Sequence, residues 1–279
     1  MRKCNEWTIR MPDSLVPDKM TRDKKISVAS ASRFSVVAEN VQSKLTSDGF
    51  VIIKDFVTKE ELHEVVIILD SLYEKFGSLP KSLAFDLGDI KYHDGRLQIP
   101  EINKVASLAP IIKETAFYKK ALDLSRQICG DKAAYIHDHA IYKAPFNDKE
   151  TPWHQDEAGS YGRFLHMNQL HWWLPLQASD QYNGAMQYVP QSHLGRVFPH
   201  HKRNYDKRSH ALQADVVTDD VIKPSFDLGS VGVHLPRTLH YTGPNNTSHW
   251  RKAWVLQFGV TRAPWLRSLL SKARFIATT

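Results

Sequence analysis

Hydrophobic and polar positions divide this chain into a helical first part and a strand-rich second part. Thr58 and Glu61 form a capping-box pattern, and the apolar residues that follow recur every three or four positions, which predicts an amphipathic helix. Helices are also indicated over residues 32–46 and 117–129. The run of β-branched and aromatic residues at 49–56 predicts a buried strand between the first two helices.

Beyond residue 131 the pattern changes to short runs of β-type residues. The predicted strands cover residues 133–143, 170–177, 186–189, 214–217, 231–235 and 253–260. Turn signals such as Asn183-Gly184 and Gly243-Pro244 lie between them. Many short strands with this punctuation are typical of an antiparallel barrel or sandwich. We therefore expect a mainly β fold with flanking helices.

A single domain is expected to hold most of the chain. The first 30 residues are polar and predict a loose N-terminal arm. Residues 31–279 show neither an internal repeat nor a low-complexity linker, so we assign them to one domain. A closing helix is predicted near residues 266–275.

Composition places the chain among ordinary globular proteins. Hydrophobic residues make up 42% and charged residues 24%, which excludes disordered and coiled-coil classes. No apolar stretch approaches the roughly 18 residues that a membrane span requires. The two cysteines, Cys4 and Cys129, form neither a disulfide framework nor a cysteine metal site, and the N-terminal residues lack a secretory signal. We therefore predict a cytoplasmic protein.

The charge balance favours anionic partners. Lysine and arginine number 37 against 30 aspartates and glutamates, a net charge of +7. The densest basic cluster covers residues 200–208, but no nucleic-acid-binding motif accompanies it, so we expect neither nucleic acid nor a membrane as partner. Within this cluster, Lys202 and Arg203 are candidates for contacting an anionic small-molecule substrate, and a solvated loop explains them equally well.

The sharpest chemical feature is the tripeptide His154-Gln155-Asp156. On a strand, residues two apart point to the same face, so the imidazole and the carboxylate would converge on one point inside a barrel. They would supply two ligands of a facial two-histidine, one-carboxylate triad, which leaves open positions on Fe(II). Alone the pattern is weak, because such triplets are frequent by chance.

A third ligand must come from a histidine on another strand. The downstream candidates are His193, His200, His201, His210, His234, His240 and His249. His240 stands out because it ends a strand run and is followed eleven residues later by Arg251. An arginine fork grips a carboxylate with two hydrogen bonds, as a 2-oxoglutarate-dependent oxygenase needs for the far end of its cosubstrate. Thr242 offers a hydroxyl to the same carboxylate.

Several segments together resemble the phytanoyl-CoA dioxygenase family of non-haem iron, 2-oxoglutarate-dependent oxygenases. The matching segments are residues 48–53, 58–62, 152–156, 173–176, 183–193, 240–245 and 251–253. The resemblance runs from about residue 45 to residue 260. One departure is Gln191, where the family pattern before the histidine usually has glycine.

The resemblance implies a double-stranded β-helix, the jelly-roll or cupin-like barrel. It implies that His154, Asp156 and His240 hold iron and act as the catalytic centre. It further implies that Arg251 and Thr242 bind the far carboxylate of 2-oxoglutarate.

The resemblance also implies that Trp173 lines the cosubstrate pocket. The strand 135–143 matches one whose alternate residues face that pocket, which makes His139 a further candidate there, with Gln98 from a preceding segment.

These residues predict an Fe(II)- and 2-oxoglutarate-dependent dioxygenase that uses O₂ to oxidise a small organic molecule. Hydroxylation with release of succinate and CO₂ is expected. Halogenating relatives replace the carboxylate ligand by a small residue, and Asp156 excludes that option. Two alternatives stay open: a catalytically inactive binding protein of the same fold, and an unrelated cupin-like or zinc-dependent barrel. The motifs leave the substrate and the oligomeric state open.

Overall fold

The computed structural model describes residues 7–11, 28–88, 96–159, 166–202 and 212–261. Its helices are α1 (Val28–Asp48), α2 (Lys59–Glu74), α3 (Val105–Leu108), α4 (Ala116–Cys129) and α5 (Asp156–Gly159). Its strands are β1 (Thr8–Arg10), β2 (Phe50–Lys54), β3 (Ala84–Asp86), β4 (Pro100–Asn103), β5 (Ala134–Lys143), β6 (Thr151–His154), β7 (His166–Pro175), β8 (Met186–Tyr188), β9 (His200–Lys202), β10 (Leu212–Ala214), β11 (Val231–His234), β12 (His240–Thr242) and β13 (Arg251–Thr261).

Two facing sheets form the β core. The large sheet has the order β1-β2-β11-β7-β13-β5-β4-β3, and the small sheet has the order β6-β12-β8. A separate pair, β9 and β10, lies at one end. Only the β1–β2 pairing is parallel among these described strands. The predicted mainly β fold with flanking helices is confirmed.

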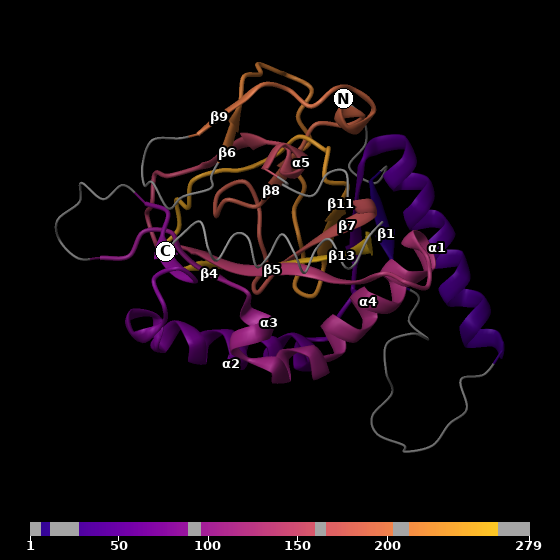
Figure 1. The fold of residues 1–279 in the computed structure, drawn as a ribbon, viewed down its shortest axis with the longest axis horizontal. Helices are drawn as coiled ribbons and strands as arrows, with labels where there is room; N and C mark the ends of the chain where they lie inside the picture. The colour runs from indigo at the N-terminus through magenta and orange to yellow at the C-terminus, as the bar shows by residue number, and fades with distance from the viewer. Residues whose placement is uncertain (1–6, 12–27, 89–95, 160–165, 203–211, 262–279) are drawn as a thin grey trace.

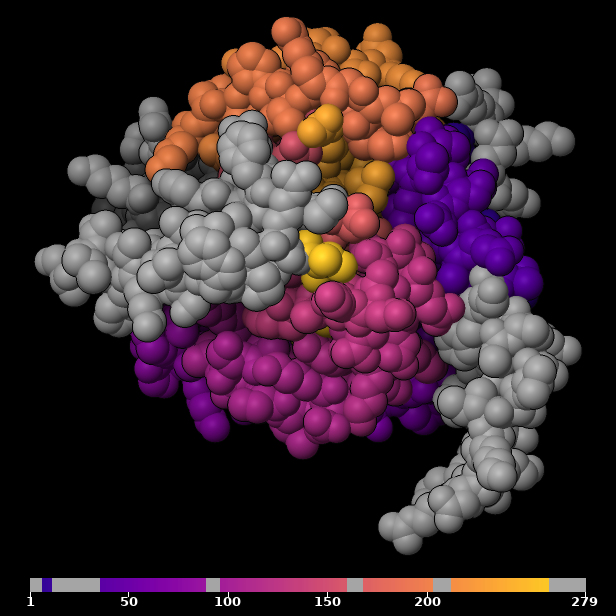
Figure 2. Space-filling model, turned by 45° about the vertical axis from the view of Figure 1, so that its right-hand side comes forward, coloured from indigo at the N-terminus to yellow at the C-terminus, as the bar shows by residue number. Residues whose placement is uncertain are grey.

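Helices α2, α3 and α4 cover the face of the large sheet that points away from the small sheet. Figure 1 shows α2, α3 and α4 below the long strands, and β6 and β8 above them. The space-filling view keeps this division, with indigo and magenta helical segments beneath and beside the orange segments (Figure 2). The barrel interior therefore lies between the two sheets, on the side away from the helices.

Side-chain alternation along the strands explains this division. Trp172 and Trp254 point to the helical layer, where both rings contact Phe117 of α4. Their neighbours Trp173 and Val255 belong to the second apolar cluster, together with residues of the small sheet. Because side chains alternate between faces, each of these strands contributes both to the core under the helices and to the core between the two sheets. Both faces of the large sheet are buried, which is why its strands read as continuous apolar runs rather than as alternating ones.

Helix α2 forms as the sequence predicts. The Thr58 hydroxyl accepts a hydrogen bond from the Glu61 backbone N–H, and the Glu61 carboxylate accepts one from the Thr58 N–H. The residues that the pattern places on one face, Leu62, Val65, Leu69 and Leu72, are buried. The helix ends at Glu74, followed by a short 3₁₀ turn.

The N-terminal segment carries more structure than a loose arm. Thr8–Arg10 form β1, which pairs with β2, and the flanking Trp7 and Met11 are buried. An edge strand of three residues lacks the length that a periodic pattern needs to be recognised. The domain boundary at residue 30 stays a prediction, and the predicted closing helix at 266–275 lies outside the described residues.

Strand ends also differ from the pattern. Strand β13 begins at Arg251, two residues earlier than expected, and β10 covers Leu212–Ala214 rather than 214–217. These strand ends contain charged or polar residues. A pattern of hydrophobic residues does not recognise such residues as part of a strand. None of the helices in the described part of the chain has the length and apolar character of a membrane span. A cytoplasmic location stays a prediction.

We predict that Thr58→Ala lowers the free energy of unfolding by about 1 kcal/mol, because it removes an N-cap hydroxyl from α2. Chemical denaturation measures the change. Thr46→Ala is the matched control, since its hydroxyl bonds only to the carbonyl of Gln42 within a helix. We expect the control to stay within about 0.5 kcal/mol of wild type. Equal losses in the two variants would contradict the assignment.

Candidate metal and cosubstrate site

Three residues from two strands and one short helix meet between the sheets. His154 is the last residue of β6, and His240 is the first residue of β12 and lies opposite His154 in register. Their ring centroids are 4.1 Å apart. We had expected Asp156 on the same strand as His154. Instead, it is the first residue of the short helix α5. The turn after His154 therefore brings the carboxylate to the imidazoles.

The spacing of the three side chains suits a single metal ion. His154 Nε2 lies 3.5 Å from Asp156 Oδ1, and His240 Nε2 lies 3.7 Å from Asp156 Oδ2. One ligand atom from each residue lies within 4.8 Å of the others. Ligand atoms bonded at about 2.1 Å and at right angles are roughly 3.0 Å apart. A small contraction would complete the set, so these residues fit a divalent metal.

Backbone carbonyls orient both histidines in the same way. His154 Nδ1 lies 2.8 Å from the Pro152 oxygen, and His240 Nδ1 lies 2.9 Å from the Thr238 oxygen. A carbonyl only accepts, so each Nδ1 carries the proton and each Nε2 presents its lone pair toward the other members of the triad. Such outer contacts fix the tautomer of metal-binding histidines.

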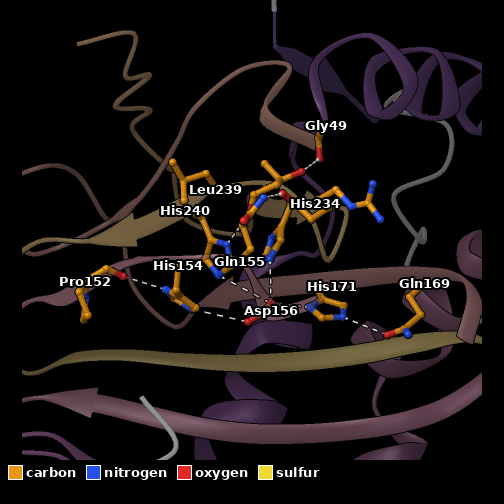
Figure 3. A network of polar contacts seen from close by, with 12 residues as sticks. Gly49, Pro152, His154, Gln155, Asp156, Gln169, His171, His234, Leu239 and His240 are labelled. Carbon is orange, nitrogen blue, oxygen red and sulfur yellow. Dashed lines mark hydrogen bonds and ion pairs between the residues drawn. The ribbon is translucent and has the colours of Figure 1, made fainter. Parts of the chain in front are cut away.

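Two further histidines contact Asp156. His171 Nδ1 lies 2.6 Å from Asp156 Oδ2, and His234 Nε2 lies 3.4 Å from the same oxygen (Figure 3). His234 was among the candidates for third ligand, but its buried Nδ1 has no acceptor in the described part of the chain. The tautomer of His234 is therefore not fixed as that of His240 is. Sequence reasoning missed His171, since a histidine in an apolar strand carries no motif.

Burial and charge set the protonation of the triad. Burial by itself raises the pKa of Asp156, but the neighbouring His240 and His171 and hydrogen bonds from imidazoles outweigh it and hold this pKa well below its usual range. Burial, reinforced by His154, holds the pKa of His240 well below its usual range. For His154, burial lowers the pKa, but hydrogen bonding to Asp156 and its charge raise it overall. The carboxylate is ionised and the His240 imidazole is neutral, as metal binding requires.

The middle residue of the tripeptide anchors it. The side chain of Gln155 is fully buried, and its amide donates to the Arg237 oxygen and accepts from the Phe198 N–H. The Gln155 backbone N–H donates to His200 Nε2, whose ring is fixed in turn by the Phe198 oxygen. These bonds hold both flanking ligands in place and account for a residue that the motif leaves unspecified.

Two cationic side chains lie side by side deeper in the barrel. Arg251 of β13 is opposite Lys143 of β5 in register, and both are buried. Lys143 Nζ donates to the Thr242 hydroxyl at 2.9 Å and to the Gly243 oxygen at 2.6 Å. The Arg251 guanidinium has no hydrogen-bond partner among the described residues, and burial lowers its pKa to about 10. It stays charged at neutral pH.

Trp173 and His139 lie in the strand row between the cations and the triad. Both are in register with Val255 of β13, one from each side. Trp173 is buried and His139 half-buried. Paired residues point to the same face of a sheet, so both side chains border the space between Arg251 and the triad.

The remaining candidates are Gln98, Lys202 and Arg203. Gln98 is half-buried beside this end of the barrel, where its carbonyl accepts from the Ala144 N–H and the Asn147 amide. Lys202 is exposed on β9, and Arg203 lies outside the described residues. Lys143 lies beside Thr242 and Arg251, and no sequence motif predicted this position.

Comparison with known proteins agrees with this geometry. The family model of phytanoyl-CoA dioxygenase matches residues 45–253. The chain belongs to the phytanoyl-CoA dioxygenase family.

Two relatives are similar to this chain over half of its length or more. A probable alpha-ketoglutarate-dependent hypophosphite dioxygenase of Stutzerimonas stutzeri is 28% identical over 52% of this chain and 51% of its own length. The alignment therefore spans about half of that relative. A probable phytanoyl-CoA dioxygenase of Caenorhabditis elegans is 23% identical over 78% of this chain and 74% of its own length.

Solved structures confirm the fold. EvdO2 from Micromonospora carbonacea var. aurantiaca, crystallised with 2-oxoglutarate, has a TM-score of 0.66 and 26% identity over 79% of this chain and 90% of its own. These findings confirm the predicted jelly-roll barrel and the membership of a dioxygenase family. The hypophosphite dioxygenase is named as alpha-ketoglutarate-dependent, and another structural neighbour, the epimerase SnoN, was crystallised with Fe3+ and alpha ketoglutarate.

The one departure from the phytanoyl-CoA dioxygenase pattern now has a structural explanation. Gln191 has a φ of 62°, in the left-handed region that favours glycine. Its backbone N–H donates to the Asp48 oxygen, and the Leu194 N–H donates to the Gln191 oxygen. The turn is therefore the one a glycine would make, and its backbone hydrogen bonds hold glutamine in the same conformation.

We predict that metal affinity falls in acid because of His154. Its raised pKa means that a proton competes for Nε2, so the apparent affinity should drop about tenfold per pH unit below that pKa. Titration of the apoprotein with Co(II) between about pH 5.5 and pH 8 measures this, with pKa values near 6.5 as reference. An affinity that stays constant over this range would contradict the assignment of His154.

Proposed function

We propose that this protein is an Fe(II)- and 2-oxoglutarate-dependent dioxygenase that oxidises a small organic substrate. The expected reaction is hydroxylation, with release of succinate and CO₂. One observation carries the proposal: a fully buried guanidinium without a hydrogen-bond partner in the described structure, in the same barrel as a metal-binding triad.

An unpaired charge in a protein interior is strongly unfavourable and is normally satisfied by an opposite charge. Arg251 is 1% exposed, and the adjacent Lys143 adds a second positive charge. The site therefore favours an anion, and a planar guanidinium matches a carboxylate with two parallel hydrogen bonds. A zinc-only barrel does not require such a site. An inactive binding protein of the same fold can keep it, and succinate formation separates that alternative.

The distance between the cations and the triad suits a short diacid. His240 and Thr242 are two residues apart on β12, and two residues of strand span about 7 Å. The Thr242 hydroxyl contacts Lys143, which is in register with Arg251. A five-carbon diacid is long enough to contact both ends. We therefore assign its far carboxylate to Arg251, with Thr242 and Lys143 beside it.

Each part of the chain has a defined role in this scheme. His154, Asp156 and His240 hold the iron, and the fixed tautomers spare the site from reorganising on binding. Trp173 and Val255 line the intervening space with apolar surface and exclude water. When bound, the metal and 2-oxoglutarate supply the oxidising chemistry, and the protein supplies orientation.

The substrate enters this proposal only as a class. We infer a small organic molecule, and Lys202 on β9 remains a candidate contact for an anionic one, with Arg203 outside the described residues. Neutralising Lys202 and Arg203 together would raise the KM of an acidic substrate, whereas an unchanged KM would remove this idea.

We predict that Arg251→Ala weakens 2-oxoglutarate binding to the metal-loaded protein at least tenfold, about 1.4 kcal/mol. Isothermal titration of the Co(II)-loaded protein measures the change. Arg126→Ala is the matched control, because that guanidinium lies on the surface of α4. Metal affinity should stay the same in both variants. Equal 2-oxoglutarate affinities in wild type and Arg251→Ala would overturn the assignment.

The activity itself is tested with the wild-type protein. Under air, with Fe(II) and 2-oxoglutarate, we expect succinate to form, and addition of candidate substrates should accelerate it. His240→Ala should abolish succinate formation, because the triad loses a ligand. A wild-type protein that binds 2-oxoglutarate but forms no succinate under any substrate would instead support an inactive binding protein.

A further inference from the structure

The second histidine pair, His171 and His234, forms an arrangement distinct from the triad. These residues lie on neighbouring strands β7 and β11, opposite each other in register, and each is 1% exposed. Both reach the same oxygen of Asp156 from the large sheet, while His154 and His240 reach the carboxylate from the small sheet (Figure 3). The carboxylate is therefore held between the two sheets.

This second group is not a second metal centre. Asp156, His171 and His234 offer ligand atoms within 4.8 Å of one another. However, His171 Nδ1 is only 2.6 Å from Asp156 Oδ2. Two atoms that bind one metal at about 2.1 Å are roughly 3.0 Å apart or more. The shorter distance is that of a charge-assisted hydrogen bond, with the imidazole N–H as donor.

The hydrogen bond gives the two carboxylate oxygens of Asp156 different surroundings. Oδ2 accepts from His171 at 2.6 Å, while Oδ1 lies on the side of the triad, 3.5 Å from His154 Nε2. The other ring nitrogen, Nε2, lies 3.2 Å from the side-chain amide of Gln169, and the ring is buried in the sheet. A donor enclosed in this way has little room to turn away from Oδ2.

We propose that His171 is a positioning residue that keeps Oδ2 of Asp156 hydrogen-bonded, so that the carboxylate offers only Oδ1 to the metal. The proposal rests on the proposed function. It matters because a six-coordinate ion with three protein ligands keeps three positions open. A carboxylate that used both oxygens would leave two positions, and 2-oxoglutarate would compete with it. His171 therefore acts on cosubstrate affinity through Asp156.

Two variants of nearly equal size separate this role from a purely structural one. In His171→Asn the amide nitrogen takes the place of Nδ1 and still donates to Oδ2. In His171→Gln the amide nitrogen reaches the place of Nε2 and points toward Gln169 instead. Both variants remove the ring from the core, so any loss caused by packing alone affects both alike.

The experiment loads each protein with Co(II) or, without air, with Fe(II). Three quantities are measured: metal affinity, 2-oxoglutarate affinity of the loaded protein, and the visible charge-transfer absorption that 2-oxoglutarate produces on Fe(II). We expect metal affinity within about threefold of wild type in both variants, since Asp156 remains a ligand. We expect 2-oxoglutarate affinity to fall at least tenfold in His171→Gln, with a shifted absorption, and to recover in His171→Asn.

Two results would overturn the inference. One is equal 2-oxoglutarate affinity in the two variants, whether both match wild type or both have lost it. The other is loss of the metal itself in His171→Gln, which would mean that His171 holds the whole carboxylate rather than one oxygen. Failure of the proposed function would give a different result: the wild-type protein would bind metal, but the metal-loaded protein would not bind 2-oxoglutarate.

Discussion

The rest of the site depends on the contacts that the carboxylate of Asp156 makes with the surrounding histidines. It is the point where the large and the small sheet meet through polar groups, with His171 and His234 on one side and His154 and His240 on the other. Burial opposes its charge, and the surrounding imidazoles outweigh that cost, so its pKa stays low. Four imidazoles surround this carboxylate, three of them buried and His154 half-buried, and its negative charge is the partner that they share.

A second electrostatic constraint lies at the other end of the barrel. Lys143 is satisfied by oxygens of Thr242 and Gly243, but Arg251 beside it is not satisfied by any described residue. The protein thus keeps an anionic centre at the triad and a cationic centre deeper in the core, with apolar walls between them. Under the proposed function, this polarity would orient a small diacid in one direction only, with its far carboxylate at the cationic end.

The sequence predicts the repeated features better than the isolated ones. Helix α2 follows from its periodicity and its capping box, and the strands from β5 to β13 follow from β-type runs between turns. The tripeptide at 154–156, with His240 and Arg251, follows from residue types and spacing. His171 and Lys143 do not, because their importance arises from register: each lies opposite a partner that only strand pairing reveals. Strand β1 is too short for any pattern.

The most direct test of the account counts the imidazoles on the bound metal. Pulsed electron paramagnetic resonance or X-ray absorption of the metal-loaded protein distinguishes imidazole ligands from oxygen ligands. Four histidines lie around Asp156, and we assign only His154 and His240 to the metal. We therefore predict two imidazoles, unchanged when 2-oxoglutarate is added. A third imidazole, or the loss of one on adding 2-oxoglutarate, would contradict it.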